Sequence, residues 1–127
     1  DDEAFNQIVL DQLFGRLSLT IAIVSSPEEA LLSIRNQAIQ NPYDLLIVDY
    51  DMPQMSGPEL IQTVRQFELN EGVPRAIIFG HTAFGQQERD EMLKSGADDI
   101  LKKPTSLPGL KSLLGLYGLI PLSKATI

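Results

Sequence analysis

A short apolar run that ends in an acid constrains the fold of this chain more than any other feature. Residues Leu45 to Val48 are all apolar, and Asp49 follows them directly. An uninterrupted run of this length is typical of a strand buried on both faces of a parallel sheet. Such a strand needs helices above and below it, so the run predicts an α/β domain. With 127 residues and 43% apolar side chains, the chain suffices for one domain with one core.

Strand and helix patterns alternate along the rest of the chain. Further β-branched or apolar runs predict strands at 19–24, 76–79 and 100–101. Apolar residues at helical spacing, with serine, proline and glycine at the ends, predict helices at about 3–17, 27–40, 57–67, 86–94 and 106–117. This alternation predicts a doubly wound parallel sheet with right-handed crossovers and helices on both faces.

Composition excludes several classes of function. With 17 acidic against 10 basic residues, the net charge is −7, so we expect no binding to nucleic acid or to anionic membrane surfaces. The absence of cysteine and the single histidine exclude disulfides, a cysteine nucleophile and the usual zinc sites. No apolar stretch approaches the roughly 18 residues of a membrane span, and the acidic start is unlike a signal peptide. We therefore expect a soluble domain.

Polar residues follow the predicted strands at the edge where an open α/β sheet places its functional crevice. They are Asp49, Thr82 or a neighbour, and Lys103, and Asp1 and Asp2 precede the first predicted helix. Three acids would repel one another unless a cation offsets their charge, and magnesium is the usual oxygen-bound ion where phosphoryl groups also bind. A carboxylate there can accept a phosphoryl group as an acyl phosphate, with the metal, lysine and hydroxyl facing the equatorial oxygens.

The segment 43–57, YDLLIVDYDMPQMSG, closely resembles the phosphoacceptor segment of response regulator receiver domains, the aspartate-phosphorylated modules of two-component signalling. Asp1-Asp2, Thr82-Ala83, residues 96–99 and Lys103-Pro104 match further family motifs in family order, over residues 1 to about 117. Asn6 and Val9-Leu10 resemble the start of receiver domains that are fused to hybrid histidine kinases.

The resemblance implies a role for each site residue. Asp49 would be the phosphorylated aspartate, and Asp1 and Asp2 would hold Mg²⁺ directly or through water. Asp51 would give its backbone carbonyl to the metal. Thr82 would donate a hydrogen bond to a phosphoryl oxygen, and Lys103 would pair with the phosphoryl group or with Asp49.

The resemblance also implies a fold, a partner and a location. The fold would be flavodoxin-like, with five parallel strands in the order 2-1-3-4-5. The phosphoryl group would come from a histidine on a partner kinase or phosphotransfer domain in the cytoplasm. The domain would not be an enzyme in the usual sense, since its own chemistry is self-phosphorylation and slow hydrolysis. A homodimer stays open, and we expect no contact of this domain with nucleic acid or membrane.

The first strand of that fold is missing before Asp1, so we expect residues 1–117 to form a receiver domain without its leading strand. Either the strand lies before the given sequence, or another subunit or the tail at 118–127 supplies it. The tail is a poor candidate, because residues 123–126 are too polar for a strand buried on both faces.

Two local departures from the family pattern concern the switch. The segment from Thr82 to Gly96 is one residue shorter than usual, so Gly80 or His81 could take the place of the hydroxyl, although Thr82 fits best. Ile100 stands where many members have an aromatic switch residue, so the output would travel by other movements of the helix at 86–94 and the strand at 100–101.

Two other functions fit part of the pattern. Asp49-Tyr50-Asp51 after an apolar strand also matches the nucleophile motif of haloacid dehalogenase-like phosphohydrolases. There the acidic pair follows the lysine, whereas Asp98-Asp99 precede Lys103 here, so the order argues against this alternative. The other is a degenerate receiver that takes no phosphate and acts only as an interaction module.

Overall fold

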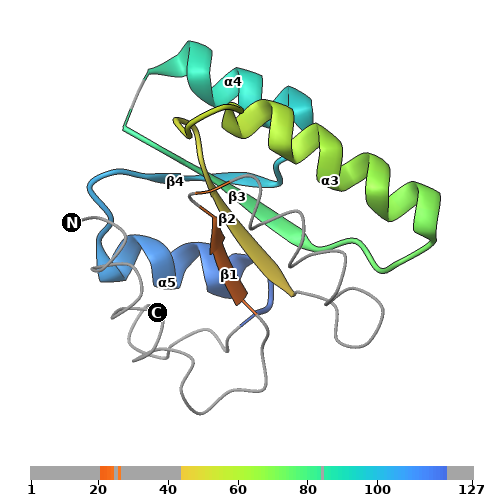
Figure 1. The fold of residues 1–127 in the computed structure, drawn as a ribbon. Coiled ribbons are helices and arrows are strands. Elements are labelled where there is room, and N and C mark those ends of the chain that lie inside the picture. Colours follow the sequence, from red (N-terminus) through yellow and green to blue (C-terminus); the bar gives the residue numbers. More distant parts are fainter. Residues whose placement is uncertain (1–20, 25, 27–43, 84, 120–127) are drawn as a thin grey trace.

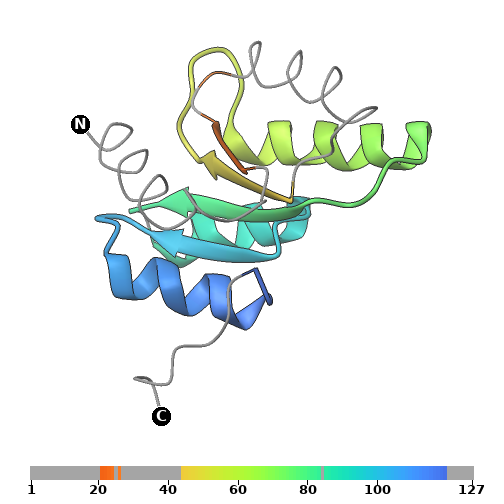
Figure 2. The same ribbon diagram turned by 90° about the horizontal axis from the view of Figure 1, so that it is seen from below.

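The computed structural model describes residues 21–24, 26, 44–83 and 85–119. The elements, in chain order, are β1 (Ile21–Val24), β2 (Leu45–Asp49), α3 (Gly57–Glu71), β3 (Ile77–Thr82), α4 (Gln86–Ser95), β4 (Asp99–Lys102) and α5 (Leu107–Leu116). The four strands form one parallel sheet, with α3 and α4 on one face and α5 on the other (Figures 1 and 2). The predicted α/β architecture is therefore confirmed. The helices expected at 3–17 and 27–40 lie outside the described residues.

The order of the described strands is β1-β2-β3-β4. β1 pairs directly with β2, with Ile21 opposite Leu45 and Val24 opposite Val48. The order 2-1-3-4-5 would place a further strand between these two, and the described part of the chain contains none. β2, β3 and β4 follow one another as the predicted third, fourth and fifth strands should.

β3 is longer than the sequence predicted. We expected a strand at 76–79 from its run of apolar residues, but the strand covers Ile77–Thr82. A Cβ atom on Gly80 would lie 2.4 Å from the sulfur of Met92, so glycine serves here to let α4 approach the sheet and does not end the strand. As a result Thr82 is the last residue of β3 rather than the first of a loop.

Two apolar clusters cover the two faces of the sheet, as the alternation of side chains along the strands requires. One lies between the sheet and the helices α3 and α4, and its large members are Leu46, Val48, Leu60, Ile61, Val64, Ile78 and Met92. The other lies between the sheet and α5, and consists of Leu45, Ile47, Phe79, Leu101, Leu110 and Leu114. The apolar run after residue 44 is thus buried on both faces, as predicted.

Ser106 and Gly96 lie at the helix ends that the sequence indicated, and Ser56 is a cap that it did not single out. Ser56 caps the start of α3 by accepting a hydrogen bond from the backbone of Glu59, and Ser106 caps α5 in the same way through Gly109. α4 ends at Gly96, whose φ of 122° is favourable only for glycine. No helix in the described ranges is long and apolar enough to cross a membrane.

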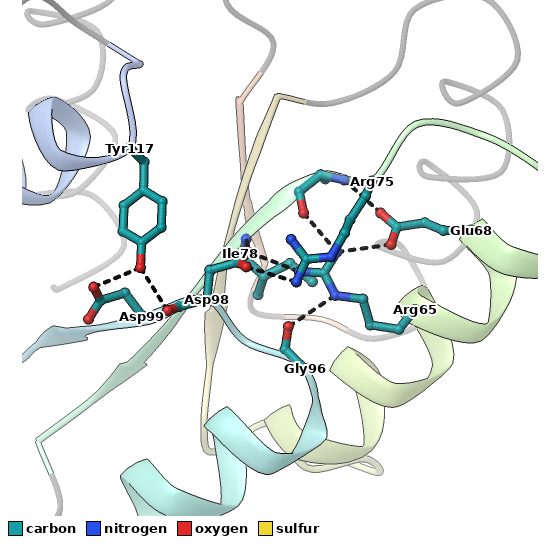
Figure 3. Close-up of polar contacts among 9 residues, drawn as sticks. Arg65, Glu68, Arg75, Ile78, Gly96, Asp98, Asp99 and Tyr117 are labelled. Atoms are coloured by element: carbon teal, nitrogen blue, oxygen red, sulfur yellow. Dashed lines mark hydrogen bonds and ion pairs between the residues drawn. The ribbon is translucent and has the colours of Figure 1, made fainter.

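A buried polar network, which the sequence did not predict, ties α3 to the amino-terminal edge of the sheet (Figure 3). The guanidinium of Arg65 donates to the carboxylates of Glu68 and Asp98, each at 2.9 Å, and to the carbonyls of Gly96 and Ala76. Only 14% of its side chain is exposed.

The two carboxylates bound by Arg65 also hold the backbone. Glu68 accepts the backbone N–H of Ala76, and Asp98 accepts that of Ile78. Asp98 also pairs with Arg75, whose side chain is mostly exposed. The network therefore fixes the start of β3, the turn before β4 and the middle of α3 with one set of charges.

Tyr117 extends this polar region toward α5 (Figure 3). Its hydroxyl lies 2.8 Å from the carbonyl of Asp98 and 3.0 Å from a carboxylate oxygen of Asp99. Burial, followed by the hydrogen bond and the negative charge of Asp99, raises the pKa of Tyr117 from 10.0 to about 12.

This raised pKa predicts a loss of stability in alkali. Because the folded state favours the neutral phenol, the contribution of Tyr117 is complete below pH 10 and is lost as the pH rises toward 12. We expect the free energy of unfolding, measured in urea, to fall more steeply across this window in the wild type than in Tyr117→Phe. Equal slopes for the two proteins would contradict the assigned environment.

Candidate functional site

The carboxyl ends of β2, β3 and β4 meet at the edge of the sheet opposite the Arg65 network. Asp49 is the last residue of β2, and its side chain is 26% exposed. The backbone N–H of Tyr50 donates to the carbonyl of His81, and the carbonyl of Tyr50 accepts from Gly57. These bonds tie the chain after Asp49 both to β3 and to the start of α3, so the position of the carboxylate is well fixed.

Lys103 reaches this carboxylate from the far side of β3. Its Nζ atom lies 3.0 Å from both Oδ1 and Oδ2 of Asp49, and its side chain is 20% exposed. The backbone N–H of Lys103 donates to the carbonyl of Thr82, and the peptide bond between Lys103 and Pro104 is cis. Two of the residues predicted for the site are therefore in direct contact.

Thr82, the predicted hydroxyl, ends β3 next to Lys102 in the register of the sheet. It is almost wholly buried, with 1% of its surface exposed. Of the two other candidates for that place, Gly80 lies against Met92 and has no side chain to offer, and His81 has its ring bound to Thr105 at 2.7 Å. The role of Thr82 toward a phosphoryl group stays a prediction.

Gly57 lets α3 begin directly against the end of β2. A Cβ atom at this position would lie 2.4 Å from the carbonyl oxygen of Asp49 and 2.9 Å from the Cα of Tyr50. The sequence identified Gly57 as the start of a helix and as part of the segment that resembles the family, and the close approach to the site depends on packing that no local pattern reveals. Gln54, in the same loop, has a positive φ of 73°.

The residue after Asp49 links the site to α4. The hydroxyl of Tyr50 donates to Glu91 at 2.9 Å. This hydrogen bond, together with burial and the nearby acidic charges, raises the pKa of Tyr50 above 10.0. Ile100, at the place of the family's aromatic residue, packs instead against the apolar cluster under α3 and α4. Tyr50 thus makes a hydrogen bond from this end of the sheet to α4, whereas Ile100 contributes apolar packing.

The predicted metal ligands are only partly within the described residues. Asp51 is exposed in the loop that follows β2, and Asp1 and Asp2 lie outside the described ranges. No group of three histidine, cysteine or acidic side chains with the spacing of a metal site occurs among residues 21–24, 26, 44–83 and 85–119. The carboxylate of Asp49 and the backbone near Asp51 offer oxygen atoms only, which is the donor chemistry that magnesium prefers.

At this open edge of the sheet, the ammonium group of Lys103 contacts both oxygens of the Asp49 carboxylate. The carboxylate of Asp49 can act as a nucleophile, and the lysine can neutralise negative charge that arrives with a substrate. The geometry therefore suits the acceptance of an anionic group.

Comparison with known proteins agrees with this geometry. The family model for the response regulator receiver domain matches residues 1–114. The chain is 32% identical over 118 residues to the sensor histidine kinase RcsC of Escherichia coli and 33% identical over 117 residues to the virulence sensor protein BvgS of Bordetella pertussis. These alignments cover 92% and 90% of this chain but only 12% and 9% of the relatives, so the chain spans about a tenth of their length.

Solved structures show the same fold. A putative response regulator from Chloroflexus aurantiacus has a TM-score of 0.68 and 28% identity, with 91% of this chain and 90% of that chain covered. The receiver domain of the sensor histidine kinase PA1611 from Pseudomonas aeruginosa has a TM-score of 0.68 and 25% identity, with 92% and 91% covered. That receiver domain holds a magnesium ion in its active site cleft.

These neighbours confirm the flavodoxin-like fold class, and the comparisons give no support to the haloacid dehalogenase or degenerate-receiver alternatives. The match to the family model begins at residue 1 and ends at residue 114, so it includes all the described strands and most of α5. By its sequence and by the structure of its sheet, the chain belongs to the response regulator receiver domain family.

Proposed function

We propose that Asp49 accepts a phosphoryl group from a phosphorylated histidine, in a reaction that requires Mg²⁺. The observation that carries this proposal is the contact of Lys103 Nζ with both carboxylate oxygens of Asp49, at 3.0 Å each. The contact brings together, from two separate strands, the nucleophile and the cation that the family resemblance assigns to the transfer.

In the transfer, a carboxylate oxygen of Asp49 forms a bond to phosphorus. The bond from phosphorus to the histidine nitrogen breaks, and its electron pair stays on the imidazole. Lys103 then faces the phosphoryl oxygens and offsets their negative charge, which is the main catalytic requirement of phosphoryl transfer. Thr82 donates its hydroxyl proton in a hydrogen bond to another phosphoryl oxygen.

The residues that would hold the metal are Asp49, the backbone carbonyl of Asp51, and Asp1 and Asp2. Bound magnesium supplies positive charge to the phosphoryl oxygens and to the acidic residues around them. The oxygen-only donors on the described side of the site fit this ion, and a receiver neighbour carries it in its cleft.

The similarity to much longer sensor proteins suggests in which kind of protein the domain occurs. Since the relatives are sensor histidine kinases of which this chain matches about a tenth, we propose a receiver within a hybrid kinase, or a partner of one, in the cytoplasm. A histidine kinase or a phosphotransfer domain would be the donor. We also propose that the receiver domain ends at residue 117 and that residues 118–127 form a tail.

Beryllofluoride, which mimics a phosphoryl group on aspartate, tests the site without a kinase. We expect amide NMR signals of Asp49, Thr82 and Lys103 to shift when beryllofluoride and Mg²⁺ are added together, because the adduct would contact all three residues. Neither component alone should produce the full change, and Asp49→Asn should abolish it. Shifts that persist in Asp49→Asn would overturn the assignment of the acceptor.

A further inference from the structure

We propose that the hydrogen bond between His81 and Thr105 positions Lys103 for phosphoryl acceptance. The inference rests on the proposed function of Asp49 and adds two positioning residues to it. Nε2 of His81 lies 2.7 Å from Oγ1 of Thr105, and His81 is buried, with 3% of its surface exposed.

Lys103 needs to be positioned because a whole strand separates it from Asp49. Lys103 follows β4, whereas Asp49 ends β2, and β3 lies between them. Neighbouring strands are about 4.8 Å apart, so roughly 10 Å separates the backbones of β2 and β4, a gap that the extended side chain of Lys103 and the carboxylate of Asp49 close together. A long side chain stretched this far reaches its target only if its own backbone is held in place.

Two bonds from β3 hold that backbone on either side of the cis peptide bond. Before it, the backbone N–H of Lys103 donates to the carbonyl of Thr82. After it, Thr105 is bound by the ring of His81. The second bond thus adds a side-chain anchor from β3 to the residue that follows Pro104.

The placement of His81 suits this role. In the register of the sheet it lies opposite Asp49 on one side and Leu101 on the other. Alternation along β3 puts its side chain on the face of Phe79, which α5 covers. Thr105 directly precedes Ser106, the cap of α5. The bond therefore connects the strand next to the acceptor, the lysine loop and the start of the covering helix.

The test compares two substitutions of Thr105 in two backgrounds. Thr105→Val keeps the shape of the side chain but removes its hydroxyl, whereas Thr105→Ser keeps the hydroxyl. With acetyl phosphate and Mg²⁺, we expect Thr105→Val to slow the phosphorylation of Asp49 about tenfold, which corresponds to the loss of one hydrogen bond. We expect Thr105→Ser to stay near the wild-type rate.

The second background separates positioning from folding. In Lys103→Met, Thr105→Val should cause no further loss of rate, because the residue that the bond positions is gone. Its effect on the free energy of unfolding should persist in both backgrounds. Equal rate losses in the two backgrounds, or a loss of stability with an unchanged rate, would overturn the proposal.

A further measurement does not depend on phosphorylation. In lysine-specific ¹⁵N NMR spectra, the ammonium of Lys103 bound to Asp49 should give a slowly exchanging signal, which Asp49→Asn identifies by removing it. Thr105→Val should broaden or shift this signal, and Thr105→Ser should keep it. An unchanged signal in Thr105→Val contradicts the positioning role. If the variants change the signal as expected but the wild-type protein is not phosphorylated, only the proposed function is contradicted.

Discussion

Replacement of Arg65 by methionine lowers the free energy of unfolding by about 3–5 kcal/mol, the usual result of removing one partner from a buried ion pair. Methionine keeps much of the apolar stem, so the change isolates the guanidinium. Its loss leaves the carboxylates of Glu68 and Asp98 without their main cation, and the carbonyls of Gly96 and Ala76 without a donor. The start of β3 and the turn before β4 should loosen together.

Arg75→Met is the matched control for this prediction. Arg75 pairs with the same Asp98 carboxylate, at 2.8 Å, but 57% of its side chain is exposed. We expect it to cost less than about 1 kcal/mol, since solvent screens exposed pairs. Urea unfolding at neutral pH measures both variants. Similar losses for Arg65→Met and Arg75→Met would show that the buried network does not stabilise the fold as described.

Replacement of Lys103 by methionine slows the phosphorylation of Asp49 by about 10²- to 10³-fold, the range seen when one donor to a developing negative charge is removed. The carboxylate itself remains, so slow modification should persist. Because Asp49 and Lys103 are both partly exposed, we expect the stability to change by no more than about 1 kcal/mol. The rate would be followed by intact-protein mass spectrometry with acetyl phosphate and Mg²⁺.

Lys102→Met is the matched control, because it removes the same charge as Lys103→Met. It is the neighbouring residue and exposed, so Lys102→Met removes one positive charge without touching the site. We expect it to leave the rate within about twofold of the wild type, because distant exposed charges are screened. Equal losses in Lys102→Met and Lys103→Met would mean that net charge, and not the contact with Asp49, governs the reaction.

Much of this architecture was predictable because its signals are local. The apolar run before Asp49 predicted a strand buried on both faces, and Gly57, Gly96 and Ser106 marked helix ends that the structure confirms. The predicted meeting of Asp49 and Lys103 follows from parallel strands alone, since their carboxyl ends share one edge. Family resemblance was needed to turn this acid and lysine into a phosphoryl acceptor.

Other features could not be predicted, because they depend on contacts between residues far apart in the chain. Nothing in the helical pattern of α3 distinguishes Arg65 from a solvent-facing arginine until the turn at Gly96 packs against it. β3 was predicted too short because its apolar run ends at Phe79, and the contact that needs a glycine at position 80 comes from Met92 of α4. The partner of His81 in its hydrogen bond, Thr105, is likewise 24 positions away in the chain.

The most direct test of the proposed function is to locate the phosphoryl group on the chain. After incubation with acetyl phosphate and Mg²⁺, reduction of the acyl phosphate with borohydride converts the modified aspartate to homoserine, which peptide mass spectrometry can place. We predict homoserine at position 49, dependent on Mg²⁺ and absent from Asp49→Asn. Modification at another residue, or none at Asp49 under conditions that phosphorylate a known receiver domain, would contradict the proposal.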